Sequence, residues 1–155
     1  MVLITVGTQK QEFNRMFELV RKSKELKKEE LIVQRGYTKC NNSKRIKAFD
    51  FIPLEQMEEY ISKADIIISH GGVGTIFSAI KKGKKVIAIP RLEKYGEHIN
   101  DHQIEICEEL EKEGYILYYK DGIDDLDKLI NKLKTTQFKK YSSDNNYIDI
   151  LRKEI

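Results

Sequence analysis

The segment Asp-Ile-Ile-Ile-Ser at residues 65–69 constrains the fold of this chain more than any other part of its sequence. Three consecutive isoleucines leave no polar face, so a strand formed here must be buried on both sides. Strands of this kind lie at the centre of parallel sheets that helices cover on both faces. The segment therefore predicts an α/β domain with a mainly parallel sheet.

The rest of the chain alternates short β-branched runs with amphipathic helical segments, which is typical of βαβ units. The expected strands are residues 2–6, 31–34, 46–52, 65–69, 86–89 and 115–119. The expected helices lie within residues 13–20, 54–61, 75–82, 99–110 and 123–133. We predict one Rossmann-like domain over residues 1–138. Residues 139–155 form a tail, in which we expect Tyr147, Ile148, Leu151 and Ile155 to line an amphipathic docking helix.

Composition excludes several classes of function. The 155 residues are 40% hydrophobic and 34% charged, as in a folded domain, and 28 basic against 25 acidic residues give a net charge of +3. This excess is dispersed, so we expect no nucleic-acid partner. Cys40 and Cys107 lie far apart in sequence, which indicates neither a disulfide nor a metal site, and we expect no cofactor. No apolar run approaches the ~20 residues of a membrane span and no leader is evident, which favours a cytoplasmic location.

The strongest candidate site is the segment His70-Gly71-Gly72-Val73-Gly74-Thr75, which directly follows the apolar strand. Glycines at a strand-to-helix junction expose backbone N–H groups beside the positive end of the helix dipole, and this arrangement binds phosphate or pyrophosphate. Thr75 adds a hydroxyl group, and His70 adds a ring donor. The alternative is a tight turn that needs glycine for steric reasons alone. Three glycines within four residues favour the phosphate site.

Two further loops lie at predicted strand ends. Gly7-Thr8-Gln9 follows the first strand and is a weak signal on its own. Residues 94–103 include Glu97, His98, Asp101, His102 and Gln103, whose polar groups suit recognition of sugar hydroxyls. The alternative for this second loop is helix capping with surface histidines. A metal site at His98 and His102 is less favoured, because further ligands are not evident.

Taken together, these motifs resemble the family 28 glycosyltransferase C-terminal domain. The matching pieces are Val6-Gly7-Thr8-Gln9, Phe51-Ile52-Pro53-Leu54, Ile68-Ser69 with the glycine segment, Tyr95-Gly96-Glu97-His98 and Asp101-His102-Gln103. The chain is similar to the small subunit of two-component bacterial polysaccharide glycosyltransferases and to the cytosolic subunit of the dolichol-linked N-acetylglucosamine transferase. The resemblance implies one half of a GT-B architecture, which binds a UDP-sugar donor.

The resemblance also implies a role for each segment. Phe51 and Ile52 are expected near the uracil, residues 72–75 near the pyrophosphate, residues 7–9 at the cleft, and Asp101 and Gln103 on the donor sugar. Related domains often carry a glutamate for the ribose hydroxyls early in the helix after the glycine segment. This chain has Ser78 there, so ribose recognition is weaker or comes from another residue such as Glu97.

A chain of this length has room for one GT-B domain, so the resemblance implies a membrane-anchored partner subunit that supplies the acceptor side. The acceptor is expected to be a lipid-diphosphate-linked sugar at the inner membrane face, in capsule or exopolysaccharide synthesis. The glycine segment and helix dipole stabilise the UDP leaving group without a metal. Glu97 and His98 are candidates for the base, which can also lie on the partner.

Two alternatives remain at this point. Gly72-Val73-Gly74 begins a dinucleotide-binding pattern, but Phe77 occupies the position of its third glycine and the segment follows a late strand. An NAD-dependent oxidoreductase is therefore disfavoured. The chain can also be a non-catalytic sugar-nucleotide-binding or enhancer subunit of the same fold.

Overall fold

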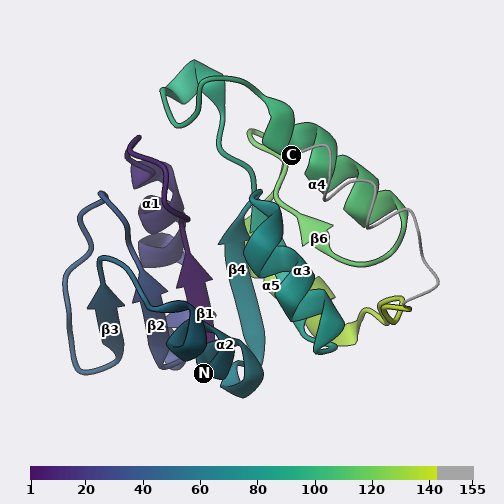
Figure 1. Cartoon of the computed structure of the whole chain (residues 1–155), viewed down its shortest axis with the longest axis horizontal. Helices are drawn as coiled ribbons and strands as arrows, with labels where there is room; N and C mark the ends of the chain where they lie inside the picture. The colour runs from purple at the N-terminus through teal and green to yellow at the C-terminus, as the bar shows by residue number, and fades with distance from the viewer. Residues whose placement is uncertain (143–155) are drawn as a thin grey trace.

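The computed structural model describes residues 1–142 and contains a six-stranded parallel sheet in the order β3-β2-β1-β4-β5-β6 (Figure 1). The strands are β1 (Val2–Thr5), β2 (Leu31–Gln34), β3 (Ile46–Phe49), β4 (Ile66–His70), β5 (Lys85–Ile89) and β6 (Leu117–Tyr118). The order reverses between β1 and β4, as in doubly wound nucleotide-binding folds. The expected α/β class with a parallel sheet is confirmed.

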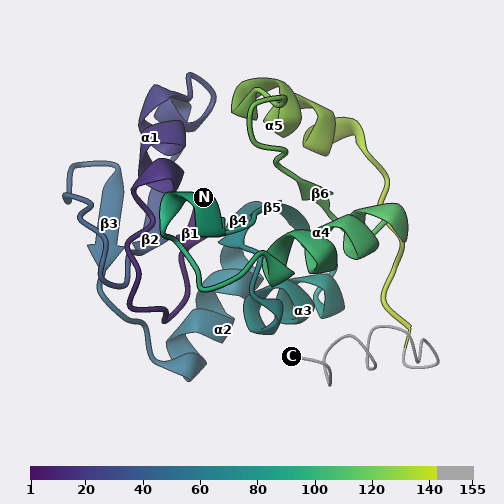
Figure 2. The same ribbon diagram turned by 90° about the horizontal axis from the view of Figure 1, so that it is seen from above.

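Helices cover both faces of this sheet (Figure 2). They are α1 (Asn14–Lys22), α2 (Leu54–Lys63), α3 (Val73–Lys81), α4 (His102–Lys112) and α5 (Leu126–Thr135), with the short 3₁₀ helices η1 (Leu26–Lys28) and η2 (Glu93–Tyr95). Helices α1 and α5 pack on one face, where Met16 and Leu129 join its buried apolar cluster. Helices α2, α3 and α4 pack on the other, where Phe77 and Leu110 belong to a second cluster.

Strand β4 lies between β1 and β5, with both neighbours parallel to it. Ile67 and Ile68 point to opposite faces and are fully buried in the two different clusters. Burial of each such side chain contributes about 1.5–3 kcal/mol to folding. The prediction that this segment is a central strand buried on both faces is confirmed.

Some element ends differ from the predicted ones. Strand β3 stops at Phe49, not at residue 52, because the segment after Asp50 leads towards α2, which begins immediately after Pro53. Strand β6 is only two residues long. Helix α4 starts at His102, so Ile99, which was expected on its apolar face, lies in the preceding loop and is 76% exposed. Apolar periodicity alone therefore extended this helix too far.

The C-terminal docking helix expected at Tyr147, Ile148, Leu151 and Ile155 lies outside the described residues. The division between domain and tail after residue 138 stays a prediction. Before the described part ends, the Lys139 N–H donates to the Gly114 carbonyl at 2.8 Å. Within residues 1–142, no helix combines the length and apolar character that a bilayer span requires.

Candidate functional site

The carboxyl ends of the parallel strands meet at one edge of the sheet, and Gln34 joins three of them. Its Oε1 accepts hydrogen bonds from the Thr5 hydroxyl (2.6 Å) and the Gly7 N–H (3.0 Å). Its Nε2 donates to the carbonyls of Gly7 (2.9 Å) and Asp50 (3.1 Å). The amide of this buried side chain is fully engaged. Gln34 thus fixes the loop after β1 against the ends of β2 and β3, a role that sequence analysis missed.

Gly7 occupies a place that other residues cannot take without strain. Its φ of +79° lies in the left-handed region, and an added Cβ would lie 2.4 Å from Nε2 of His70. Thr8 and Gln9 follow it as exposed residues of the loop. The first strand-end loop is therefore packed directly beside His70, and its place at a donor cleft stays a prediction.

His70, the last residue of β4, is a buried neutral imidazole. Burial, followed by the charge of Arg91, lowers its pKa from 6.5 to about 3, although the contact with Gln103 acts in the opposite direction. Nδ1 accepts a hydrogen bond from the Gly72 N–H at 3.1 Å, so the ring proton is assigned to Nε2. His70 therefore shapes the glycine turn without adding positive charge at neutral pH.

Gln103, from the first turn of α4, holds the same turn from the other side. Its Oε1 accepts from the N–H groups of Gly71 and Arg91, each at 3.0 Å, and its amide nitrogen lies 3.2 Å from Nδ1 of His70. The side chain is buried, and an added Cβ on Gly71 would lie 2.7 Å from Cβ of Gln103. This geometry favours a positioning role for Gln103 over the expected direct contact with a sugar.

The open part of the glycine segment is its second half. Helix α3 begins at Val73, and no side chain among residues 1–142 caps its N-terminus. Gly74 faces open space, since no described atom beyond its chain neighbours and its own helix backbone lies within 4 Å of an added Cβ. The first-turn N–H groups of Val73, Gly74 and Thr75 thus remain available to an anion. Gly71 and Gly72 meet a steric need, whereas Gly74 leaves room for a ligand.

Arg91 is a second residue that sequence analysis missed. Its side chain is fully buried after β5, where its guanidinium donates to the carbonyls of Val6, Gln11 and Glu97 at 2.7–3.2 Å. It also lies over the Phe13 ring, 4.9 Å from the centroid. Burial lowers its pKa to about 10, opposed by the charge of Glu97. Arg91 joins the loops after β1 and β5, and its only sequence signal is a charge directly after an apolar strand and Pro90.

Glu97, one of the two candidates for the base, forms a buried bidentate ion pair with Arg15. Its Oε1 accepts from Nη2 of Arg15 (2.9 Å) and the Leu92 N–H (3.0 Å), and its Oε2 accepts from Nε of Arg15 (3.1 Å). The Glu97 side chain is only 4% exposed. These contacts favour a structural role, so its catalytic assignment stays a prediction that the geometry does not support.

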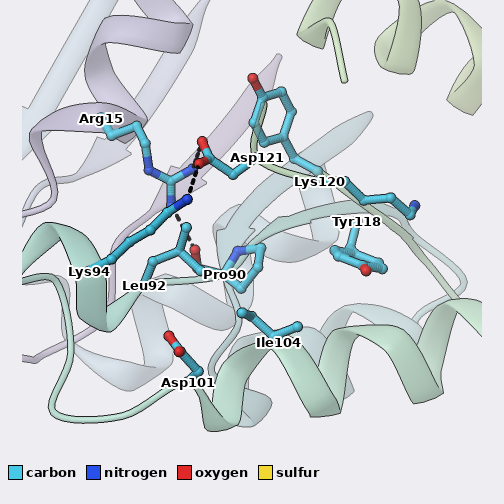
Figure 3. Close-up of a pocket in the computed structure, with 10 residues that line it drawn as sticks. Arg15, Pro90, Leu92, Lys94, Asp101, Ile104, Tyr118, Lys120 and Asp121 are labelled. Carbon is cyan, nitrogen blue, oxygen red and sulfur yellow. Dashed lines mark hydrogen bonds and ion pairs between the residues drawn. The ribbon is translucent and has the colours of Figure 1, made fainter. Parts of the chain in front are cut away.

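A pocket of about 290 Å³ lies next to this ion pair, at the carboxyl ends of β5 and β6 (Figure 3). Arg15 and Asp101 line it, and Arg15 donates to the Pro90 carbonyl at 2.8 Å. The Asp101 carboxylate accepts from the Glu93 N–H at 2.9 Å. His98 is half-buried, with Nδ1 accepting from Asn100 N–H at 3.3 Å, and His102 is exposed beside Glu105. The loop at residues 94–103 therefore faces a different pocket from the one that Gly74 lines.

Phe51 and Ile52 lie in the loop between β3 and α2. The Phe51 ring is 47% exposed and meets Tyr37 edge to face, with ring centroids 5.4 Å apart, while Ile52 is half-buried. Leu54, at the start of α2, lines a separate cavity that reaches Gly74 and Thr75.

This doubly wound sheet, with a glycine turn after its central strand, defines a Rossmann-like domain that places ligands beyond the carboxyl ends of its strands. Over residues 1–149 the sequence matches the glycosyltransferase family 28 C-terminal domain, and the chain belongs to that family. The resemblance noted from the motifs is confirmed.

Named relatives agree with this assignment. The human UDP-N-acetylglucosamine transferase subunit ALG13 is 38% identical over 64 residues, which are 41% of this chain but only 5% of the human protein. The solution structure of ALG13 superposes with a TM-score of 0.62 at 18% identity, covering 97% of this chain and 93% of that one. The kitacinnamycin glycosyltransferase gives a TM-score of 0.62 at 16% identity, with 97% and 37% covered. The fold is thus half of a GT-B architecture.

Proposed function

We propose that this chain is the donor-binding subunit of a UDP-sugar-dependent glycosyltransferase. The observation that supports it best is the uncapped N-terminus of α3, which follows the central strand and offers the N–H groups of Val73, Gly74 and Thr75 to an anion. Family membership and the ALG13 relatives, whose name specifies a UDP-N-acetylglucosamine transferase subunit, favour UDP-linked sugars as the ligand class.

In this proposal the site residues divide into two groups. The N-terminus of α3 binds the pyrophosphate, Phe51 and Ile52 lie near the uracil, and Asp101 and His102 approach the donor sugar. The second group builds the site without touching the donor; its members are Gly7, His70, Gly71, Gly72 and Gln103. Thr8 and Gln9 line the cleft on the side where an acceptor enters.

The chemistry expected of such a site is electrostatic. Negative charge grows on the UDP leaving group as the glycosidic bond breaks, and the helix dipole with its free N–H groups stabilises that charge. The base that takes the acceptor proton is assigned to His98 or to a partner residue, because both oxygens of Glu97 are already engaged.

We further propose that a membrane-anchored partner supplies the acceptor half of the GT-B cleft. The described sheet forms one Rossmann-like unit, and the ALG13 relatives are named as subunits of a transferase, which favours a partner subunit. The acceptor proposed is a lipid-diphosphate-linked sugar at the cytoplasmic membrane face, in synthesis of a surface polysaccharide. Radiolabelled UDP-sugars incubated with the chain and membranes of its source cells test this step through label in extracted lipid.

Isothermal titration of the full chain with UDP, with NAD as a control ligand, tests donor binding. We expect heat from UDP and none from NAD. No UDP binding at millimolar ligand would contradict the proposal. The Gly74→Asp variant sharpens the test, because an added Cβ has no close neighbour outside its own helix and the helix dipole stabilises a carboxylate in the first turn.

Gly74→Asp should therefore keep the fold but repel a diphosphate, with a loss of at least about tenfold in UDP affinity, or roughly 1.4 kcal/mol. Gly74→Asn, which has the same shape without the charge, is the matched control and should lose much less. Equal UDP affinities of Gly74→Asp and Gly74→Asn would contradict a pyrophosphate site at Gly74.

A further inference from the structure

A cavity of about 500 Å³ lies between α2 and α3 and begins at the N-terminus of α3. Both helices run away from the carboxyl edge of the sheet and cover the same face (Figures 1 and 2). Its lining consists of Leu54, Met57, Glu58 and Ile61 from α2 and Gly74, Thr75, Phe77, Ser78 and Lys81 from α3. Apolar side chains thus form most of its α2 wall, while Glu58 adds a carboxylate to that wall.

The Glu58 carboxylate is held in place by residues of α3 and the turn after it. The Ser78 hydroxyl lies 2.7 and 2.8 Å from its two oxygens, and Lys82 Nζ donates to Oε2 at 2.6 Å. The hydrogen bonds from Lys82 and then Ser78 lower the pKa of Glu58, so the group is ionised at neutral pH. Its side chain remains 39% exposed, which leaves acceptor positions open to the cavity.

Two opposite electrostatic features therefore line one cavity. The free N–H groups at Gly74 and Thr75 attract an anion, whereas the ionised Glu58 beside Ser78 repels one and accepts hydroxyl donors. Ser78 lies four positions after Gly74, which is about 6 Å along a helix. A ligand that satisfies both features carries a phosphate at one end and hydroxyl groups a short distance away. The ribose of a nucleoside diphosphate has this arrangement.

We infer that Glu58, positioned by Ser78, accepts hydrogen bonds from the ribose hydroxyls of the donor nucleotide and selects ribonucleotides over deoxyribonucleotides. This inference rests on the proposed function and assigns a specificity residue to its site. It also gives Ser78 a role, because its hydroxyl positions a carboxylate that comes from α2. Glu97, the alternative named from sequence, is engaged with Arg15 and does not line this cavity.

Titration of the full chain with UDP and with 2′-deoxy-UDP tests this assignment. The wild-type chain should bind UDP at least about tenfold more tightly, as expected when a hydrogen bond to a charged group is lost. Glu58→Gln removes the charge and should bring the two affinities close together by weakening UDP. The matched control is Glu59→Gln, which removes an exposed carboxylate paired with Lys63 on the same helix and should keep the full ratio.

Glu58 also connects α2 to α3, so Glu58→Gln can lower thermal stability. The ratio of the two affinities separates recognition from folding, because any loss of folded protein weakens both nucleotides equally. Moving the carboxylate onto α3 in the double variant Glu58→Gln/Ser78→Glu should restore the ratio. Equal affinities of the wild type for UDP and 2′-deoxy-UDP, or an unchanged affinity ratio in Glu58→Gln, would overturn the assignment of Glu58 and leave the proposed function untouched. Absence of binding by both nucleotides would overturn the proposed function and this inference with it.

Discussion

Alanine substitutions at Gly72 and Gly74 should have opposite effects on stability, although the two glycines lie only two residues apart. Gly72 has an ordinary φ of −78°, so alanine meets no backbone strain there. Its Cβ, however, would lie 2.0 Å from Cε1 of His70, a distance that forces the ring to move. At Gly74 an added Cβ has no described atom within 4 Å.

The magnitudes follow from these contacts. Overpacking a core site costs about 1–3 kcal/mol, and a displaced His70 ring also loses its hydrogen bond from Gly72 N–H, worth about 0.5–1.5 kcal/mol. Gly72→Ala should therefore lose about 1.5–4.5 kcal/mol of unfolding free energy. Gly74→Ala should gain about 0.5–1 kcal/mol, because alanine replaces glycine within a helix.

Urea unfolding of the two variants beside the wild type measures this difference through the transition midpoints, provided that the m values agree. A Gly72→Ala midpoint equal to that of the wild type would refute the steric argument. The same reasoning affects how activity is interpreted: a bulky residue at Gly72 disrupts the turn whether or not a phosphate binds. Substitutions at Gly74 are therefore the cleaner test of the ligand.

Two further predictions concern the buried polar groups. The folded pKa of His70, about 3, lies below the ordinary value of 6.5, so the unfolded chain binds a proton that the folded chain excludes. The unfolding free energy should then fall as pH drops below about 6.5, by up to about 1.4 kcal/mol per pH unit, in urea unfolding between about pH 7.5 and 5. The control variant His102→Gln should keep this pH dependence. An unfolding free energy of the wild type that does not change over this range would contradict the prediction. Arg15→Ala, which leaves the 4%-exposed Glu97 carboxylate unpaired, should cost about 3–5 kcal/mol in the same assay. If Arg15→Ala lost no more unfolding free energy than an ordinary surface substitution does, the predicted contribution of the Arg15–Glu97 ion pair would be wrong.

The sheet was predictable because its signals are local. Three isoleucines in a row require burial on both faces, and the alternation of short runs with helical segments requires parallel strands. Element ends were less predictable, since Ile99 continues the apolar spacing of α4 but lies in an exposed loop. Periodicity reports which residues can share a face, whereas the start of a helix depends on where the chain leaves the sheet.

The sequence indicates a candidate site at the strand ends only in outline, and its ligand stays a prediction. Gln34, Arg91 and Glu58 carry no motif, because their contacts reach residues 16, 20 and 85 positions away in sequence. Gln103 was noticed for its chemistry, yet its amide is bonded to the turn after β4 and to the Arg91 N–H. A polar side chain looks the same in sequence whether it binds a ligand or another part of the chain.

The sequence by itself determined the parallel α/β fold and the central strand, and it predicted the glycine segment as the place for an anion. Only the tertiary structure decided which glycines serve packing and which one leaves space, since that depends on His70 and Gln103 approaching Gly71 and Gly72 from separate elements. Local propensity follows from neighbouring residues. The assignment of each polar group follows from long-range contacts, which exist only once the helices and strands have packed.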